Sequence, residues 1–173
     1  MTGYPGLRTN INKIMNRKGI ITLLLAVFLA IFFYFSIREI APEEIENEPD
    51  WVSLSEAFDR ADVDEKLILV DIFEVGCKFC RKMTREVYPA PSTRAVIDRG
   101  FHPVKVNGNS EDPVTFRGDE MTSAEFAALM GVTAYPFTVI LDSDGTVLAR
   151  QRGYMGVQNL TQFMRDALNE RQM

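Results

Sequence analysis

The chain has 173 residues, which suits one compact domain of ordinary size plus a short appendage. Its formal net charge of −5 is unevenly distributed, because the first 37 residues carry +4 and the remainder carries −9. An acidic globular part argues against nucleic-acid binding. Only two cysteines and one histidine are present, which leaves little material for a disulfide framework or a zinc site.

Near the N-terminus, residues 19–37 form an uncharged run of Leu, Ile, Phe, Val and Ala. At about 1.5 Å per residue, a helix of this length crosses most of a ~30 Å hydrocarbon layer. Basic residues come before the run, and no acidic residue occurs before Glu39. This asymmetry predicts a single-pass anchor with a cytoplasmic N-terminus and the remainder of the chain on the far side of the membrane.

A cleaved signal peptide is the alternative interpretation. Its apolar region is normally about 7–15 residues long and ends at a small-x-small site. Here the run is longer and ends in the bulky residues 32–37, so a retained anchor is favoured and cleavage stays open. A lipoprotein is excluded, because no cysteine lies near this segment.

Residues 38–50 contain six acids and two prolines, a composition typical of a solvated spacer with no partner of its own. The chain is therefore predicted to have four parts: a basic cytoplasmic N-terminus at 1–18, a transmembrane anchor at 19–37, an acidic linker at 38–50 and a folded domain at 51–173.

The folded part alternates strand and helix signals. An apolar run at 67–73 is too continuous for a strand with one wet face, so it predicts a buried strand. A helix is expected over 77–87, with Pro89 and Pro91 ending or kinking it. Strands are also predicted at 51–53 and 101–106, together with a helix at 54–61 that has Ser53 or Ser55 near its cap.

Beyond these elements, the Gly-, Asn-, Asp- and Pro-rich residues 107–121 predict a loop. A capping box at 122–125 predicts a helix through Met130, and a turn at 142–145 predicts a hairpin of 137–141 and 146–151. A last helix is expected over 157–168. The sequence thus indicates an α/β domain with a central mixed sheet flanked by helices.

Cys77 and Cys80 are the only cysteines, and they directly follow the buried strand at 67–73. Two thiols at this spacing can close a disulfide and reopen it. We expect Cys77 at a helix N-terminus, where free backbone N–H groups and nearby cationic side chains favour the thiolate. Cys80, one turn later, should be more buried and act as the resolving thiol.

Asp71 lies inside the apolar strand, where burial of a carboxylate is costly and raises its pKa. Beneath the cysteines it could move a proton to or from Cys80, with Lys105 of the neighbouring strand as its ionic partner. An exposed edge position is the alternative. Pro136, at the start of a strand, would expose the backbone of Tyr135 to an extended substrate chain if its peptide bond is cis.

These residues together resemble the thioredoxin superfamily over most of 51–170. The resemblance rests on Asp71 with the following Cys-Lys-Phe-Cys, on Val-Lys-Val at 104–106, and on the Ala-Tyr-Pro-Phe segment with the later hairpin and Gly153. Trp51, Glu56-Ala57 and Glu86-Val87-Tyr88 are similar to bacterial periplasmic thioredoxin-like proteins, including the SoxW-like group and the C-terminal domain of the DsbD-type reductase. Departures from the thioredoxin pattern are Gly76, Lys78-Phe79 and Phe137.

The resemblance implies a thioredoxin fold preceded by the membrane helix, in the cell inner membrane with the domain in the periplasm. It also implies that Cys77 is the nucleophile, Cys80 the resolving thiol, Asp71 the proton relay and Pro136 a cis-proline, with no cofactor. The expected function is thiol–disulfide exchange with protein thiols and disulfides. Reduction, fed by a membrane electron donor, is favoured over disulfide oxidation or isomerisation.

Other site classes fit less well. Zinc needs about four ligands, and His102 with two cysteines does not supply them. Arg81 stands where a c-type haem motif needs histidine, and the turn at 142–145 lacks the later glutamate of a calcium loop. A non-catalytic binding module with the same fold remains the main alternative to an enzyme.

Overall fold

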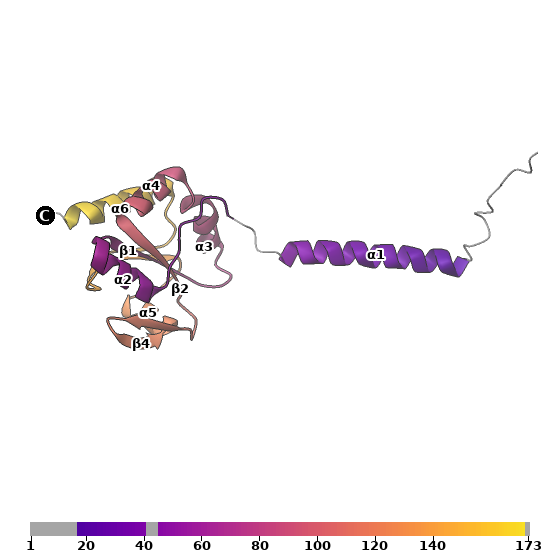
Figure 1. The fold of residues 1–173 in the computed structure, drawn as a ribbon, viewed down its shortest axis with the longest axis horizontal. Coiled ribbons are helices and arrows are strands. Elements are labelled where there is room, and N and C mark those ends of the chain that lie inside the picture. The colour runs from indigo at the N-terminus through magenta and orange to yellow at the C-terminus, as the bar shows by residue number, and fades with distance from the viewer. Residues whose placement is uncertain (1–16, 41–44, 172–173) are drawn as a thin grey trace, which may run out of the picture. The chain divides into compact units, whose positions relative to one another are not determined.

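The computed structural model describes residues 17–40 and 45–171. Most of the predicted basic N-terminus and residues 41–44 of the predicted linker lie outside the described residues. The chain divides into two compact units, Met1–Glu44 and Ile45–Met173, which are drawn in Figure 1 and are described separately.

In the first unit, α1 spans Arg17–Ile40. Within it, Gly19–Ser36 has a mean hydropathy of 2.5 and is long and apolar enough to cross a membrane. Its large apolar side chains are exposed, as they are on a helix that lacks a protein core to bury them. This helix is therefore a possible single-pass anchor.

The second unit carries all the remaining elements. Its helices are α2 (Leu54–Asp64), α3 (Lys78–Lys82), the π-helical turn η2 (Met83–Val87), α4 (Pro91–Gly100), α5 (Ser123–Leu129) and α6 (Val157–Glu170). Its strands are β1 (Leu67–Phe73), β2 (Phe101–Asn107), β3 (Pro113–Phe116), β4 (Asp119–Thr122), β5 (Phe137–Leu141) and β6 (Val147–Arg152).

Four strands form the central sheet in the order β2-β1-β5-β6. Strand β1 is parallel to β2 and antiparallel to β5, so the sheet is mixed as predicted. Strands β3 and β4 form a separate two-stranded sheet. Because β1 is central, side chains on both of its faces are buried, which explains its continuous apolar sequence.

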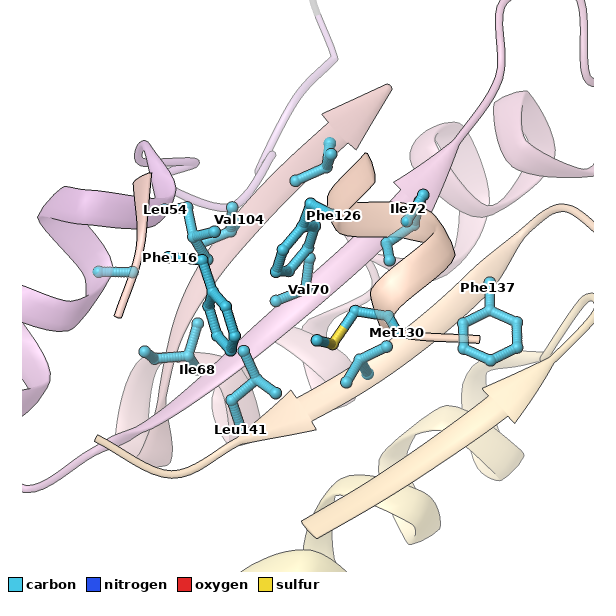
Figure 2. Close-up of a cluster of buried hydrophobic side chains, with 14 of the residues drawn as sticks. Leu54, Ile68, Val70, Ile72, Val104, Phe116, Phe126, Met130, Phe137 and Leu141 are labelled. Carbon is cyan, nitrogen blue, oxygen red and sulfur yellow. The ribbon is translucent and has the colours of Figure 1, made fainter. Parts of the chain in front are cut away.

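The two faces of the sheet carry two separate cores. Ile68, Val70 and Ile72 of β1 point to one face, where α2, α5 and Phe116 of β3 cover them (Figure 2). Leu67 and Leu69 point to the opposite face, where η2, α4 and α6 pack. This alternation places Asp71 on the second face, toward the helices that follow the two cysteines.

Local sequence signals predicted several of these elements correctly. Strand β1 has the predicted bounds, Ser53 caps α2, and Thr122 and Glu125 form the capping box of α5. The β5–β6 hairpin also forms. The strand predicted at 51–53 is reduced to a single parallel bridge from Val52 to Val104.

The helix predicted over 77–87 is present as α3 followed by η2, and it ends at Val87, before Pro89. Pro91 has a further role that was not predicted, because it opens α4, where proline is well accommodated in the first helical turn. Residues 107–121 are not only a loop, because β3 and β4 pair within them around Arg117 and Gly118, both at positive φ. Phe116 inserts into the core between Phe58 and Phe126, which secures this hairpin to the domain.

Candidate active site

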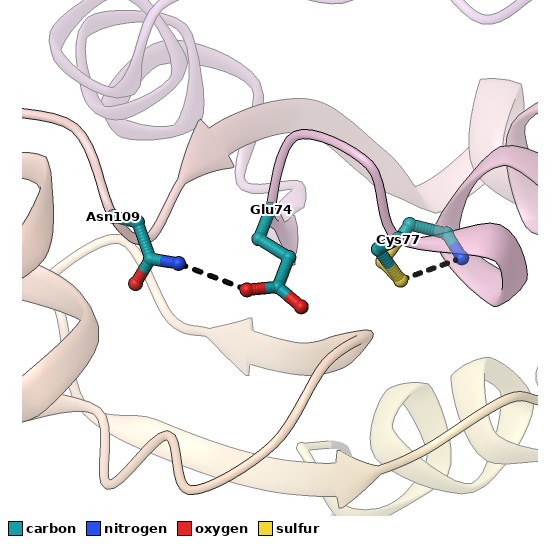
Figure 3. Close-up of a disulfide and its surroundings, with 4 residues drawn as sticks. Glu74, Cys77 and Asn109 are labelled. Carbon is teal, nitrogen blue, oxygen red and sulfur yellow. Dashed lines mark hydrogen bonds between the residues drawn. A yellow bond between two sulfur atoms is a disulfide. The ribbon is translucent and has the colours of Figure 1, made fainter.

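The two cysteines lie at the junction between β1 and α3. Cys77 is the N-cap residue of α3, and its Sγ accepts a hydrogen bond of 3.0 Å from the backbone N–H of Cys80 (Figure 3). The two residues form a disulfide with Cα atoms 5.3 Å apart. Once reduced, a thiolate at Cys77 would keep this backbone donor and the favourable end of the helix dipole.

Burial distinguishes the two sulfurs. Cys77 is half-buried and Cys80 is 3% exposed, in the order expected for an attacking and a resolving thiol. Gly76, directly before Cys77, has φ +89°, a conformation that a residue with a side chain rarely adopts. The turn through Gly76 brings the Cys77 N–H to the Glu74 carbonyl and presents Cys77 at the surface.

Cationic and aromatic side chains are exposed on α3, close to the cysteines in sequence. Lys78 and Arg81 are exposed on α3, next to the cysteines in sequence. Phe79 is 55% exposed, and its ring lies 5.9 Å from that of Tyr154, over which the Lys82 ammonium sits at 5.3 Å. The positive charge favours a thiolate at Cys77, and the exposed rings offer apolar contact to a bound chain.

Asp71 is fully buried on the central strand, so the exposed edge position considered for it is wrong. Neither carboxyl oxygen has a hydrogen-bond partner among the described residues. Burial raises the pKa of Asp71 to about 6, although the Lys105 charge and the Tyr88 hydroxyl oppose this shift. A carboxyl that titrates near neutral pH can both accept and return a proton.

Lys105 lies beside Asp71 on the neighbouring strand and its charge acts on the carboxyl, as predicted, but its direct ion pair is with another residue. The two residues are register partners on adjacent strands, but the Lys105 ammonium bonds Glu48 Oε1 at 3.1 Å instead. It also lies 4.5 Å from the centre of the Trp51 ring. The lysine therefore acts on Asp71 only through space.

Pro136 is buried, and the Tyr135–Pro136 peptide bond is cis. Phe137 pairs with Ile72, so Pro136 lies at the same end of the sheet as the turn that leads to Cys77. The structure thus brings Asp71, the cysteines and the cis-proline segment to one end of β1. His102 pairs with the opposite end of β1 and contacts Asp64 at 2.9 Å.

A polar bridge, which the sequence interpretation missed, joins the loops beside the cysteines. Asn109 donates to Glu74 Oε2 at 2.9 Å (Figure 3) and accepts from the Tyr135 hydroxyl at 2.9 Å. It thereby links the turn before Cys77 to the residue before Pro136. The Gly-Asn sequence at 108–109 indicated a turn, but nothing local to it indicated these partners.

Gly108 is in tight contact with this bridge. A Cβ at this position would lie 2.6 Å from the Tyr135 hydroxyl and 3.0 Å from Ile72 Cγ2. We expect Gly108→Ala to lower the free energy of unfolding by about 1–3 kcal/mol, because the tyrosine must leave its hydrogen bond to Asn109. Urea unfolding of the full chain in detergent measures this.

Gly156→Ala is the control for Gly108→Ala, because a Cβ there meets no atom within 4 Å. It should cause a smaller loss of stability than the change at Gly108. Equal losses for the two variants would contradict the close packing of Tyr135 against Gly108.

No group of three or more His, Cys, Asp or Glu side chains is arranged to hold a metal ion in the part of the chain that the structure describes.

Comparisons with known proteins agree on the fold. A family model described as a thioredoxin-like domain matches residues 54–168, more than half of the chain. A DsbH oxidoreductase structure is 21% identical and covers 76% of this chain and 97% of its own, with a TM-score of 0.57. A Thermus thermophilus thioredoxin is 18% identical, with coverages of 73% and 88% and a TM-score of 0.55.

The oxidised C-terminal domain of Neisseria meningitidis DsbD is also similar, at 17% identity, coverages of 66% and 92%, and a TM-score of 0.51. No curated protein matches the sequence. At these identities the solved structures show a shared fold, and the predicted fold class, a mixed sheet flanked by helices in the thioredoxin arrangement, is confirmed.

Proposed function

Because this chain belongs to the thioredoxin-like domain family, we propose that it is a thiol–disulfide oxidoreductase that reduces protein disulfides outside the cytoplasm. The observation that carries the proposal is the asymmetry of the cysteine pair. A half-buried Cys77 caps a helix after the central strand, and a buried Cys80 lies one turn behind it. The chain has the fold and the cysteine pair of such an enzyme.

The proposed reaction is a two-electron exchange. The Cys77 thiolate attacks one sulfur of a substrate disulfide, forms a mixed disulfide and releases the other substrate sulfur as a thiolate, which takes up a proton. Cys80 then loses its proton to Asp71 and attacks Cys77 Sγ. This step releases the second substrate sulfur as a thiolate, which takes up a proton, and closes the Cys77–Cys80 disulfide, so the substrate is reduced and the enzyme is oxidised.

The substrate backbone would bind beside the cis-proline segment. The edge of the loop before β5 carries Tyr135, whose side chain is held by Asn109. The backbone of Tyr135 would pair with an extended segment of the substrate, and Pro136, which has no N–H, would not donate a competing hydrogen bond. The substrate class is therefore a protein disulfide in a chain able to extend locally.

The apolar helix α1 supports a location at the membrane. We propose that it holds the domain on the outer side of the inner membrane, with the basic N-terminus in the cytoplasm. Outside the cytoplasm the reduced dithiol must be regenerated, and a membrane electron donor would supply the two electrons. Anchoring raises the local concentration of the domain for such a donor.

The deciding experiment is the reduction potential of the Cys77–Cys80 pair in the full chain in detergent, by equilibration with defined thiol buffers. A potential near the thioredoxin value of about −270 mV supports a reductase. A potential near about −120 mV would contradict the reducing direction and favour disulfide oxidation. Absence of a reversible two-electron couple would contradict enzymatic exchange altogether and favour a binding module.

A further inference from the structure

A glutamate ahead of the domain contacts the lysine beside the buried acid. Glu48 Oε1 accepts hydrogen bonds from Lys105 Nζ at 3.1 Å and from Trp51 Nε1 at 2.8 Å. The same ammonium lies 4.5 Å from the Trp51 ring centre. One carboxylate oxygen and one indole ring thus hold the charge of Lys105 in place.

The backbone around Glu48 is itself fixed to the domain. Arg94 of α4 donates to the main-chain carbonyls of Asn47 and Glu48. The Asn47 side chain donates to the Pro89 carbonyl at 2.6 Å. Within the predicted acidic linker, residues 45–50 therefore belong to the compact second unit, and the position of Glu48 is defined by contacts on both sides.

The contacts that hold Lys105 bear on the charge of Asp71. Its carboxyl is fully buried, and its register partner Lys105 carries the opposite charge that acts on it. The other groups facing Asp71 are the Tyr88 hydroxyl at the end of η2 and the Thr138 hydroxyl on β5. Among these groups only the Lys105 ammonium sits on a long side chain with many rotatable bonds. Its distance from Asp71 is therefore the one that a neighbouring residue can change.

We propose that Glu48 is a positioning residue of the proton-transfer site, which keeps the Lys105 ammonium on the Trp51 ring and away from the Asp71 carboxyl. The inference rests on the proposed function in so far as Asp71 serves as the proton acceptor for Cys80. It assigns a chemical role to residue 48, which the sequence alone placed in a solvated linker. Without Glu48 the lysine is free to approach Asp71 and stabilise its charged form.

The test measures the Asp71 carboxyl directly. The full chain, oxidised and in detergent micelles, is labelled with carbon-13 at the aspartate carboxyls, and the Asp71 signal is identified by its loss in Asp71→Asn. We expect Glu48→Gln to lower the titration midpoint of Asp71 by about half a pH unit or more. Glutamine keeps an oxygen acceptor for the Trp51 N–H, so the segment retains its place.

Glu46→Gln is the matched control, since Glu46 is an exposed acid two residues away. It should leave the Asp71 midpoint where the wild-type chain has it. An equal shift in both variants would overturn the proposal, because loss of any nearby negative charge would then suffice. An unchanged midpoint in Glu48→Gln would overturn it as well.

A double-mutant cycle separates positioning from direct repulsion. If Glu48 acts through Lys105, then Glu48→Gln should cause no further shift in the Lys105→Met background. A shift that persists there would show that Glu48 acts on Asp71 directly and would overturn the positioning role. The titration is measured on the oxidised chain without any substrate, so its outcome does not depend on whether the chain catalyses disulfide exchange.

Discussion

Replacing Cys80 with serine should stop turnover and leave a covalent complex between Cys77 and the substrate protein. The first step needs only the half-buried Cys77 sulfur, which is accessible and capped by the Cys80 N–H. The second step needs the buried Cys80 thiol, and a serine hydroxyl cannot displace the substrate. With insulin as the probe, we expect multiple-turnover reduction to fall on the order of a thousandfold or more.

The complex is measured by non-reducing electrophoresis and mass spectrometry of the full chain in detergent, reduced before the substrate is added. It should have the mass of one enzyme chain joined to a substrate chain and should disappear on treatment with a thiol reductant. Cys77→Ser is the matched control and should give no complex. A complex that forms with Cys77→Ser and not with Cys80→Ser would reverse the two roles.

The parts of the fold that the sequence predicted correctly are those set by neighbours in the chain. The apolar run of β1 and the capping box of α5 are local signals, and both elements form where expected. Cys77 at the start of a helix belongs to the same class. Burial of Asp71 was the favoured of two predictions, since a strand apolar throughout must be covered on both faces, and the structure confirms it.

The missed helix α4 had a readable signal. Val96, Ile97 and Gly100 are buried in it, and Thr93 completes the helical spacing of buried positions. No element was predicted for residues 91–100, and Pro91 was expected only to end or kink the helix before it. Strands β3 and β4 are four residues each, too short for a periodic pattern, and their place depends on the tertiary contact of Phe116.

The missed contacts of the site are long-range. Glu48 and Lys105 are 57 residues apart, and Glu74 and Asn109 are 35 residues apart. An acid-rich segment predicts no particular partner, so the hydrogen bond from Lys105 to Glu48 could not be predicted from the local sequence. Whether a lysine next to a buried acid pairs with it depends on the competing carboxylates that tertiary packing brings near.

Asp71→Asn should stabilise the domain at neutral pH. The pKa of Asp71 is raised from an ordinary value of 3.8 to about 6, chiefly by burial. The folded state therefore binds the proton more tightly than the unfolded state, and the stability that this gives is complete below about pH 3.8 and is lost as the pH rises through about 6. This loss of stability amounts to about 3 kcal/mol in the wild-type chain. It does not occur in Asp71→Asn, because asparagine has no carboxyl to ionise.

The measurement is urea unfolding of the full chain in detergent across pH, followed through the fluorescence of Trp51, the only tryptophan. The difference in unfolding free energy between Asp71→Asn and the wild-type chain should grow by about 3 kcal/mol between about pH 3.5 and pH 7.5. Asp62→Asn, at an exposed position on α2, is the control for a general effect of charge. A difference that shrinks with rising pH would contradict the raised pKa.

The same substitution should slow the chemistry. Without a carboxylate behind it, Cys80 loses its proton acceptor, and resolution of the mixed disulfide should slow on the order of a hundredfold in stopped-flow single-turnover measurements. Attack by Cys77 should be affected less, because its thiolate depends on the helix end and nearby cations. A variant that is more stable and slower at the Cys80 step separates the two roles, since a purely structural Asp71 would change stability alone. An unchanged resolution rate would remove Asp71 from the proposed proton path while leaving the dithiol exchange intact.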